Sequence, residues 1–245
     1  MLVLCCVSCR RVVVVSASAG VTNYLVRLSQ QNIPEHEQDE IIASIRKIQL
    51  NIVDKLSDVS DLYDEIDALL SELAAYASAQ SLNHSTRIAD AILSFGEQMS
   101  SRIFVKVLRT LGVDAEYFDV RQVMLTNSLY GKAEVDTEQL RVRCEAFLKS
   151  MIADKVIVTQ GFIGQDAAEN TTTLGRGGSD YSAALLAEAL GASDLSIWTD
   201  VVGIFTTDPR ITDQARAIRE ISFGEAAEMA TFGAKILHPA TLIPA

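Results

Sequence analysis

Hydrophobic residues along this chain fall into two patterns, short continuous runs and longer segments with apolar residues at helical spacing. The valine run at residues 12–15 is the clearest example of the first pattern. Because a continuous apolar run can bury both faces of a strand, it is typical of a parallel sheet covered on both sides. We therefore predict strands at 12–15, 113–120, 155–160 and 195–199, with a short strand-like segment at 204–206.

Segments of the second pattern lie between these runs. In residues 34–56, Ile41, Ile45, Ile48 and Ile52 recur with the spacing that places them on one face of a helix. The same pattern predicts helices at 21–31, 34–56, 62–78, 86–111, 135–150, 181–190 and 223–233. Strands that alternate with helices predict an α/β fold with a largely parallel sheet covered on both sides.

Composition narrows the class of protein. The 245 residues are 49% hydrophobic and 22% charged, which suits one large α/β domain or two small ones. The formal net charge of −11 would repel nucleic acids and anionic membrane surfaces, so we predict neither partner. A locally basic pocket could still bind ATP. The sequence contains no internal repeat and no linker rich in Gly, Ser or Pro.

The cysteines do not form a disulfide framework. Cys5, Cys6 and Cys9 crowd into the first nine residues, and Cys144 is remote from them. Cys6 and Cys9 form a C-x-x-C pair, but a zinc site would need two further ligands, and no histidine stands at a matching spacing. We therefore predict reduced thiols and no protein-bound metal, with metal or redox chemistry as the alternative.

The start of the chain resembles a secretory signal only in part. A small-residue stretch at 17–19 could serve as a cleavage site, but no basic segment precedes the apolar run, and Arg10 and Arg11 interrupt it. The run is also too short to span a bilayer. We predict a buried strand and a turn here, with secretion as the alternative.

Four candidate loops are rich in small and polar residues, and the last three of them also carry Arg or Lys: 16–23, 174–180, 198–210 and 233–239. In open α/β sheets, ligands bind beyond the carboxyl ends of the strands, so these loops are candidates for one site. Thr22 in the first loop could donate a hydrogen bond beside a helix N-terminus, which favours an anion. The alternative is a plain connection between a strand and a helix.

The loop at 174–180 contains three glycines together with Arg176 and Asp180. Arg176 could contact a carboxylate or a phosphate through two hydrogen bonds. Asp180 is unusual in an anion site, and could instead orient a lysine, a Mg²⁺ ion or hydrogen-bond donors. An ordinary helix N-cap formed by Ser179 or Asp180 is equally compatible with the sequence.

The two remaining loops add cationic candidates. Asp208 and Pro209 indicate a turn, and Arg210 after them is either a phosphate contact or a solvated residue. Lys235 follows a Gly-Ala turn and suits a nucleotide phosphate as a point charge. None of the four loops matches the P-loop or the dinucleotide-binding glycine pattern. The residues alone indicate an α/β protein with a site for a polyanion and a carboxylate.

Together, these segments resemble the catalytic domain of the aspartate kinases, in the amino acid kinase family. The resemblance runs in order from residue 11 to residue 245, and is strongest to lysine-sensitive monofunctional enzymes of the bacterial type and their plant counterparts. TTLGRGGSD and the WTD…TDPR pair are its most specific motifs. The similar segments are SASAGVTN, SFGEQMS, FDVR, TQGFIG, TTTLGRGGSDYSAALLA, WTDVVGIFTTDPR and AAEMATFGAKILHPAT.

The resemblance implies both a fold and a reaction. The fold is a three-layer αβα sandwich with a mostly parallel open sheet. The reaction transfers the γ-phosphoryl group of ATP, bound with Mg²⁺, to L-aspartate, and gives 4-phospho-L-aspartate. This is the first step toward lysine, threonine and methionine. The resemblance also implies a homodimer in the cytoplasm, or in a plastid if the chain comes from a plant.

The resemblance assigns roles to particular residues. Arg176 would pair with a substrate carboxylate, Glu97 would take the substrate ammonium, and Asp180 would organise the reacting groups. The implied catalytic residues are Asp180 and Arg176. The implied substrate-binding residues are Thr22, Glu97, Arg176, Gly177, Gly178 and Ser179. The implied ATP-binding residues are Thr199, Asp200, Phe205, Arg210, Lys235 and Ile236, and Phe205 replaces a tyrosine of the family.

The first ten residues depart from the family pattern. The family begins with a strand that ends in K-F-G-G-T-S, followed by a helix, and the Lys and Gly of that motif contact the transferred phosphate. Residues 1–10 contain neither Lys nor Gly. We therefore expect an atypical segment at 1–10, a catalytic domain at 11–245 that is incomplete at both ends, and a sheet without the family's first strand and helix. The alternative function is a truncated, non-catalytic remnant that keeps the ligand site or the dimer surface.

Overall fold

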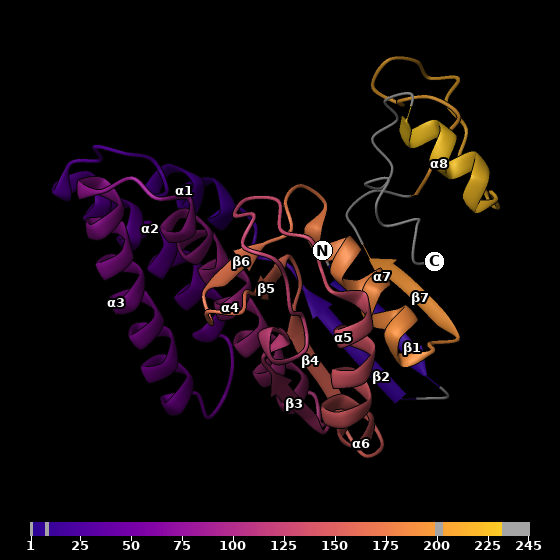
Figure 1. Cartoon of the computed structure of the whole chain (residues 1–245), viewed down its shortest axis with the longest axis horizontal. Coiled ribbons are helices and arrows are strands. Elements are labelled where there is room, and N and C mark those ends of the chain that lie inside the picture. The colour runs from indigo at the N-terminus through magenta and orange to yellow at the C-terminus, as the bar shows by residue number, and fades with distance from the viewer. Residues whose placement is uncertain (1, 8–9, 199–202, 232–245) are drawn as a thin grey trace.

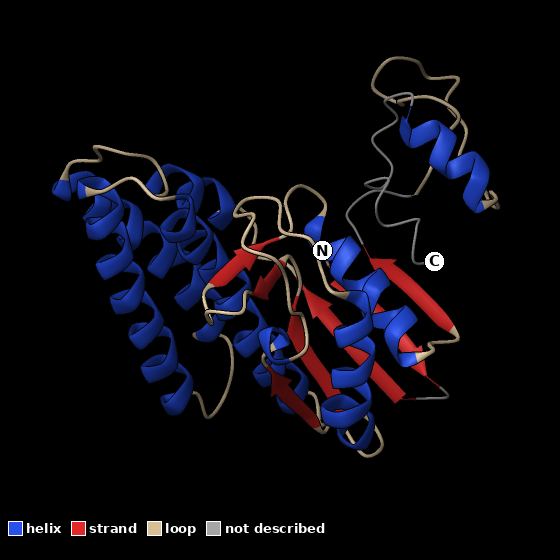
Figure 2. Ribbon diagram, viewed as in Figure 1, coloured by secondary structure: helices blue, strands red, loops and turns tan. Residues whose placement is uncertain are grey.

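The computed structural model describes residues 2–7, 10–198 and 203–231. Its main sheet has five strands in the order β3 (Ala115–Phe118), β4 (Val156–Gln160), β2 (Arg10–Val15), β1 (Leu2–Val7) and β7 (Asp194–Trp198). Strands β3, β4 and β2 run parallel, whereas β1 is antiparallel to both of its neighbours. The carboxyl ends of the three parallel strands therefore meet at one edge of the sheet (Figure 2).

Helices cover both faces of this sheet (Figure 1). On one face, α4 packs directly on the strands, and three further helices pack against α4 from outside. The helices of this face are α1 (Val21–Leu28), α2 (Glu35–Val53), α3 (Ser60–Leu82) and α4 (Thr86–Thr110). Those of the other face are α5 (Thr137–Arg143), α6 (Lys149–Met151) and α7 (Gly178–Leu190). This arrangement confirms the predicted three-layer αβα sandwich.

The valine run of β2 is buried because its side chains alternate between two hydrophobic cores. Val12 and Val14 belong to the core formed with α5 and α7. Val13 and Val15 point to the other face and pack with Val105 of α4. Successive side chains of a strand point to opposite faces, so a strand between two helical layers needs an unbroken apolar run. The predicted strand at 12–15 is therefore confirmed.

Strand β1 was not among the predicted elements. Its sequence LVLCCV pairs along its whole length with β2, from Leu2 opposite Val15 to Val7 opposite Arg10. Only residues 8 and 9 separate the two strands in the sequence. A strand thus precedes β2 in the sheet, although the sequence analysis assigns no element to residues 1–10. An apolar run of this length suits a position between β2 and β7.

Two predicted elements are interrupted in the structure. The helix expected at 135–150 is divided into α5, a π-helical turn at Cys144–Leu148 and α6. The strand expected at 113–120 is shorter, because a 3-10 turn at Val120–Gln122 follows β3. Both departures lie where a hydrophobic pattern continues without a break, so the pattern alone does not reveal them.

The polar stretch after β4 contains a small hairpin that the sequence analysis missed. Strands β5 (Ile163–Gln165) and β6 (Thr171–Thr173) pair antiparallel and lead into the glycine loop at 174–180. These strands have three residues each, too few for an apolar run from which a strand could be predicted.

The segment at 203–231 includes α8 (Phe223–Thr231) and, in place of the strand expected at 204–206, an isolated bridge between Phe205 and Ala217. Figure 1 shows this segment standing apart from the sheet and its helices. In the part of the chain that the structure describes, no helix combines the length and apolar character needed to cross a membrane.

The core between α1, α2, α3 and α4 makes a direct prediction about stability. Leu73 of α3 is 0% exposed in this core, whereas Leu82 of the same helix is 81% exposed. We expect Leu73→Ala to lower the free energy of unfolding by about 2–5 kcal/mol, because it leaves a cavity. Leu82→Ala, the matched control, should change it by less than ~0.5 kcal/mol. Chemical denaturation of both variants tests this, and equal effects would contradict the assigned core.

Candidate active site

The loop after β2 is held by helix α4. The backbone N–H of Ala17 donates to Glu97 Oε1 at 3.1 Å, and Ser100 Oγ donates to the carbonyl of Ser16 at 2.8 Å. Gly96 allows this close approach, because a Cβ there would lie 2.7 Å from the Cβ of Ala17. Helix α4 thus fixes the start of the loop at 16–20 through both side chains and close packing.

Glu97 is a buried acid on α4, and its side chain is only slightly exposed. Burial raises the pKa of Glu97 to about 7, and the hydrogen bond from Ala17 only partly opposes this rise. A cation close to this buried carboxylate would stabilise its charged form and lower its pKa. Glu97 is therefore well suited to take an ammonium group, the role that the resemblance implies.

The glycine loop at 174–180 packs against the loop that follows β4. A Cβ on Gly161 would lie 2.7 Å from the Cα of Ser179, so the two backbones are in close contact. The N–H of Gly161 also donates to the carbonyl of Val15 at 3.0 Å. The ends of β2 and β4 and the start of α7 therefore converge at the carboxyl edge of the sheet.

The predicted residues of this glycine loop differ in exposure. Arg176 and Gly177 are exposed, whereas Gly178, Ser179 and Asp180 form the buried first turn of α7. The Oδ1 atom of Asp180 is buried, with no hydrogen-bond partner among the described residues. Burial also raises the pKa of Asp180. The guanidinium of Arg176 and the N–H groups at the N-terminus of α7 can bind an anion here. This anion site lies beside the carboxylate of Asp180, whose Oδ1 atom has no partner among the described residues.

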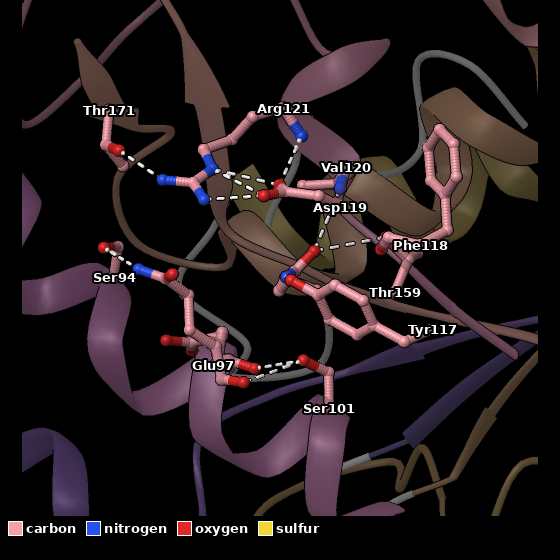
Figure 3. A network of polar contacts seen from close by, with 12 residues as sticks. Ser94, Glu97, Ser101, Tyr117, Phe118, Asp119, Val120, Arg121, Thr159 and Thr171 are labelled. Carbon is pink, nitrogen blue, oxygen red and sulfur yellow. Dashed lines mark hydrogen bonds and ion pairs between the residues drawn. The ribbon is translucent and has the colours of Figure 1, made fainter. Parts of the chain in front are cut away.

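A polar network joins the carboxyl ends of β3 and β4 (Figure 3). Gln160, the last residue of β4, donates to the hydroxyl of Tyr117. Arg121 forms an ion pair with Asp119 at 2.6 Å and donates to Thr171 Oγ1 at 2.9 Å. Because Thr171 begins β6, the network ties the small hairpin to the edge of the sheet that carries the site.

The structure does not bring every predicted residue to this edge. Thr22 is exposed in the first turn of α1, next to the loop that Glu97 holds. Phe205 and Arg210 lie in the segment at 203–231, which stands apart from α7 in Figure 1. Arg210 is exposed and pairs with Asp208 at 2.6 Å. The other four predicted ATP contacts lie outside the described residues; these are Thr199, Asp200, Lys235 and Ile236.

Sequence reasoning missed several buried polar residues that organise this edge, above all Asp90 and Gln160. A signal was present in α4, where Asp90, Ser94, Glu97 and Ser101 recur at helical spacing on a buried face. Polar residues on a buried helix face need partners, so this stripe marks a contact with other polar backbone. Within the described ranges, no three His, Cys, Asp or Glu side chains gather as a metal site would require.

The sequence profile of the amino acid kinase family matches residues 3–245 of the chain. The chain belongs to the amino acid kinase family. The match covers both the sheet edge with its glycine loop and the α4 helix that supports it, so the site described above is a site of this amino acid kinase domain.

Individual relatives of this chain are aspartokinases. The chain is 50% identical over 235 residues to lysine-sensitive aspartokinase 3 of Escherichia coli, covering 96% of this chain and 52% of that protein. The aspartokinase of Chlamydia pneumoniae is 36% identical over 232 residues, covering 95% and 50%. A crystal structure of E. coli aspartokinase III in complex with aspartate and ADP (R-state) matches with a TM-score of 0.92 and 50% identity, covering 96% and 52%. The similarity to aspartate kinases is therefore confirmed, and the chain spans about half the length of the curated relatives it matches.

The raised pKa of Glu97 predicts how the stability of this amino acid kinase domain depends on pH. The folded state holds the Glu97 proton more tightly than the unfolded state, so this stabilisation is complete below the ordinary glutamate pKa and is lost as pH rises through about 7. Relative to Glu97→Gln, the wild type should lose up to ~3 kcal/mol of unfolding free energy between about pH 5 and pH 8.

Denaturation curves at several pH values measure this difference. Glu138→Gln, which changes an exposed glutamate of α5, is the matched control and should follow the wild type. The same pH dependence in the wild type and in Glu97→Gln would contradict the assignment of a buried, proton-retaining Glu97.

Proposed function

We propose that this chain is the catalytic domain of an aspartate kinase. It would transfer the γ-phosphoryl group of ATP to the side-chain carboxylate of L-aspartate, giving 4-phospho-L-aspartate and ADP. The observation that carries the proposal is the TM-score of 0.92, at 50% identity, to aspartokinase III in complex with aspartate and ADP. The position of Glu97 and the glycine loop at one edge of the sheet supports it.

Aspartate carries one ammonium and two carboxylates, and the charges at this edge suit the ammonium and one of the carboxylates. Glu97 would hold the ammonium, because a cation relieves the desolvation of its carboxylate. Arg176 would hold the carboxylate that is not phosphorylated, through two hydrogen bonds. The N–H of Ser179 in the first turn of α7 would support the same anion, whereas that of Gly178 donates to the carbonyl of Gly175 at 3.1 Å. Thr22 would add a hydroxyl.

In the proposed reaction, one oxygen of the aspartate side chain attacks the γ-phosphorus. The bond from that phosphorus to the oxygen bridging it to the β-phosphate breaks, and ADP leaves with the electron pair. No covalent intermediate with the protein is needed, so the side chains act by positioning and by neutralising charge. Asp180 would orient the donors around the reacting groups, because its Oδ1 atom has no partner among the described residues.

We propose that ATP contacts the residues after β7 and near the end of the chain, namely Thr199, Asp200, Phe205, Arg210, Lys235 and Ile236. Mg²⁺ bound with the nucleotide would supply positive charge that neutralises its phosphates. Magnesium is commonly held by one or two carboxylates together with substrate phosphates. The buried carboxylate oxygen of Asp180 that lacks a partner within the described ranges fits such a ligand set.

The wider setting of this activity is also a proposal. The catalytic domain would comprise residues 11–245, and the segment at 1–10, atypical in sequence, would contribute strand β1 to its sheet. It would act in the cytoplasm, or in a plastid, as part of a homodimer. The product would enter the biosynthesis of lysine, threonine and methionine. Binding of aspartate or ATP without turnover would instead indicate a non-catalytic remnant.

The activity itself is tested by trapping the acyl phosphate. Incubation of the 245-residue chain with ATP, Mg²⁺ and L-aspartate in hydroxylamine should yield aspartyl hydroxamate. Asp180→Asn should lower kcat by about 100-fold or more, because an organising carboxylate near the reacting groups is lost. Asp154→Asn, an equivalent change at an exposed position, should have no effect. Absence of hydroxamate at high enzyme concentration would refute the proposed function for this chain.

Arg176→Ala tests the substrate side of the site separately. We expect the KM for aspartate to rise by about 10-fold or more, because a charge-assisted pair with the substrate carboxylate is lost. The KM for ATP should change much less. Arg141→Ala, which removes an exposed guanidinium from α5, controls for net charge. Equal loss of affinity for both substrates would contradict the role assigned to Arg176.

A further inference from the structure

Helix α4 carries a second buried carboxylate, Asp90, whose surroundings differ from those of Glu97. Asp90 is 1% exposed and stands seven residues before Glu97, which places both side chains on one face of the helix, about two turns apart. The reaction outlined above does not use Asp90. Buried polar side chains in proteins are almost always hydrogen-bonded, so the partners of Asp90 indicate its role.

Asp90 binds two backbone segments that are far apart in the sequence. Its Oδ2 atom accepts from the N–H of Gly131 at 2.9 Å and from the N–H of Thr173 at 2.7 Å. Its Oδ1 atom accepts from Thr173 Oγ1 at 2.9 Å. Both oxygens are therefore engaged by neutral donors within the protein, and each donor belongs to a loop or strand end rather than to α4.

These two segments flank the glycine loop at 174–180. Thr173 is the last residue of β6, and Leu174 after it donates its N–H to the carbonyl of Phe162 at 2.9 Å. On the other side, the carbonyl of Gly131 approaches Gly175 so closely that a Cβ there would lie 3.2 Å from it. Asp90 thus holds Thr173, which directly precedes the glycine loop, and Gly131, whose carbonyl lies against Gly175.

We propose that Asp90 is a positioning residue for the glycine loop, which it holds so that Arg176 and the first turn of α7 face the substrate. Helix α4 would then support the site at two points, with Glu97 at the loop after β2 and Asp90 at the glycine loop. The consequence for aspartate binding rests on the proposed function, whereas the effect on the loop itself does not.

Two substitutions at Asp90 separate geometry from charge. Asp90→Ala removes all three hydrogen bonds and leaves the N–H groups of Gly131 and Thr173 without that partner. Asp90→Asn can restore the contacts, because its amide oxygen can replace Oδ2 and its NH₂ group can donate to the Thr173 hydroxyl, which then acts as acceptor. Thr173→Val is a milder variant that removes only the hydroxyl contact.

The kinetic test compares both substrates. In Asp90→Ala we expect the KM for aspartate to rise by about 10-fold or more, because the loop is misplaced by a fraction of an ångström or more. The KM for ATP should stay within about 3-fold. Asp90→Asn should lie within about 3-fold of the wild type for aspartate, and Thr173→Val between the two. Leu73→Ala is the destabilised control, because it disturbs the core away from the site and should leave the KM for aspartate unchanged.

Hydrogen–deuterium exchange gives a readout that needs no catalysis. Backbone amides at 171–178 should exchange faster in Asp90→Ala than in the wild type or in Leu73→Ala, and Asp90→Asn should restore slow exchange. If Asp90→Ala does not fold, Thr173→Val carries the same comparison in a weaker form. Unchanged exchange at 171–178 would overturn the proposal, as would an Asn variant as impaired as the Ala variant.

The outcomes for Asp90 and for the proposed function can be told apart. A wild-type chain that forms no aspartyl phosphate would refute the proposed function, yet the exchange data would still decide whether Asp90 holds the loop. An active wild type with an unchanged KM for aspartate in Asp90→Ala would overturn the positioning role and leave the proposed function standing.

Discussion

Two buried carboxylates on one face of α4 are the constraint on which this site depends. A carboxylate buried away from water needs hydrogen-bond donors, because an unpaired buried charge lowers the free energy of unfolding by several kcal/mol. Glu97 accepts from the backbone of Ala17, and Asp90 accepts from the backbone of Gly131 and Thr173. The loops around the site are therefore held through their main chain by a single helix, which leaves their exposed side chains available for a ligand.

The sheet makes this arrangement possible. Strands β2 and β4 pair in parallel up to Val15 and Gln160, and the N–H of Gly161 adds one more bond to the carbonyl of Val15. The strand ends thus coincide, and the loops that follow them start side by side. Further along α4, Val105 packs against the valines of β2 on the face of the sheet. This contact fixes α4 so that its first half, with both carboxylates, reaches the loops at the strand ends.

Local sequence patterns could predict the sandwich but not the supports of its site. The run Val12–Val15 is apolar at every position because its side chains are buried on both faces of the sheet. A strand between two helical layers can therefore be predicted from the sequence. The partners of Asp90 stand 41 and 83 residues away, and no local pattern encodes such contacts. The direction of β1 was likewise beyond reach, because an apolar run looks alike in both orientations. The glycine loop was recognisable because its composition itself is unusual.

The two carboxylates of α4 differ in what they leave available. Asp90 receives donors on both oxygens from within the protein, so a ligand would gain nothing by approaching it. Burial raises the pKa of both carboxyl groups, and at Glu97, which accepts from the N–H of Ala17, it raises the pKa to about 7. A cation entering beside Glu97 would stabilise its charged form, and a neutral or anionic group would not. Two buried carboxylates on one helix face would therefore act differently, Asp90 as a support for the glycine loop and Glu97, two turns later, as a group that favours a cation.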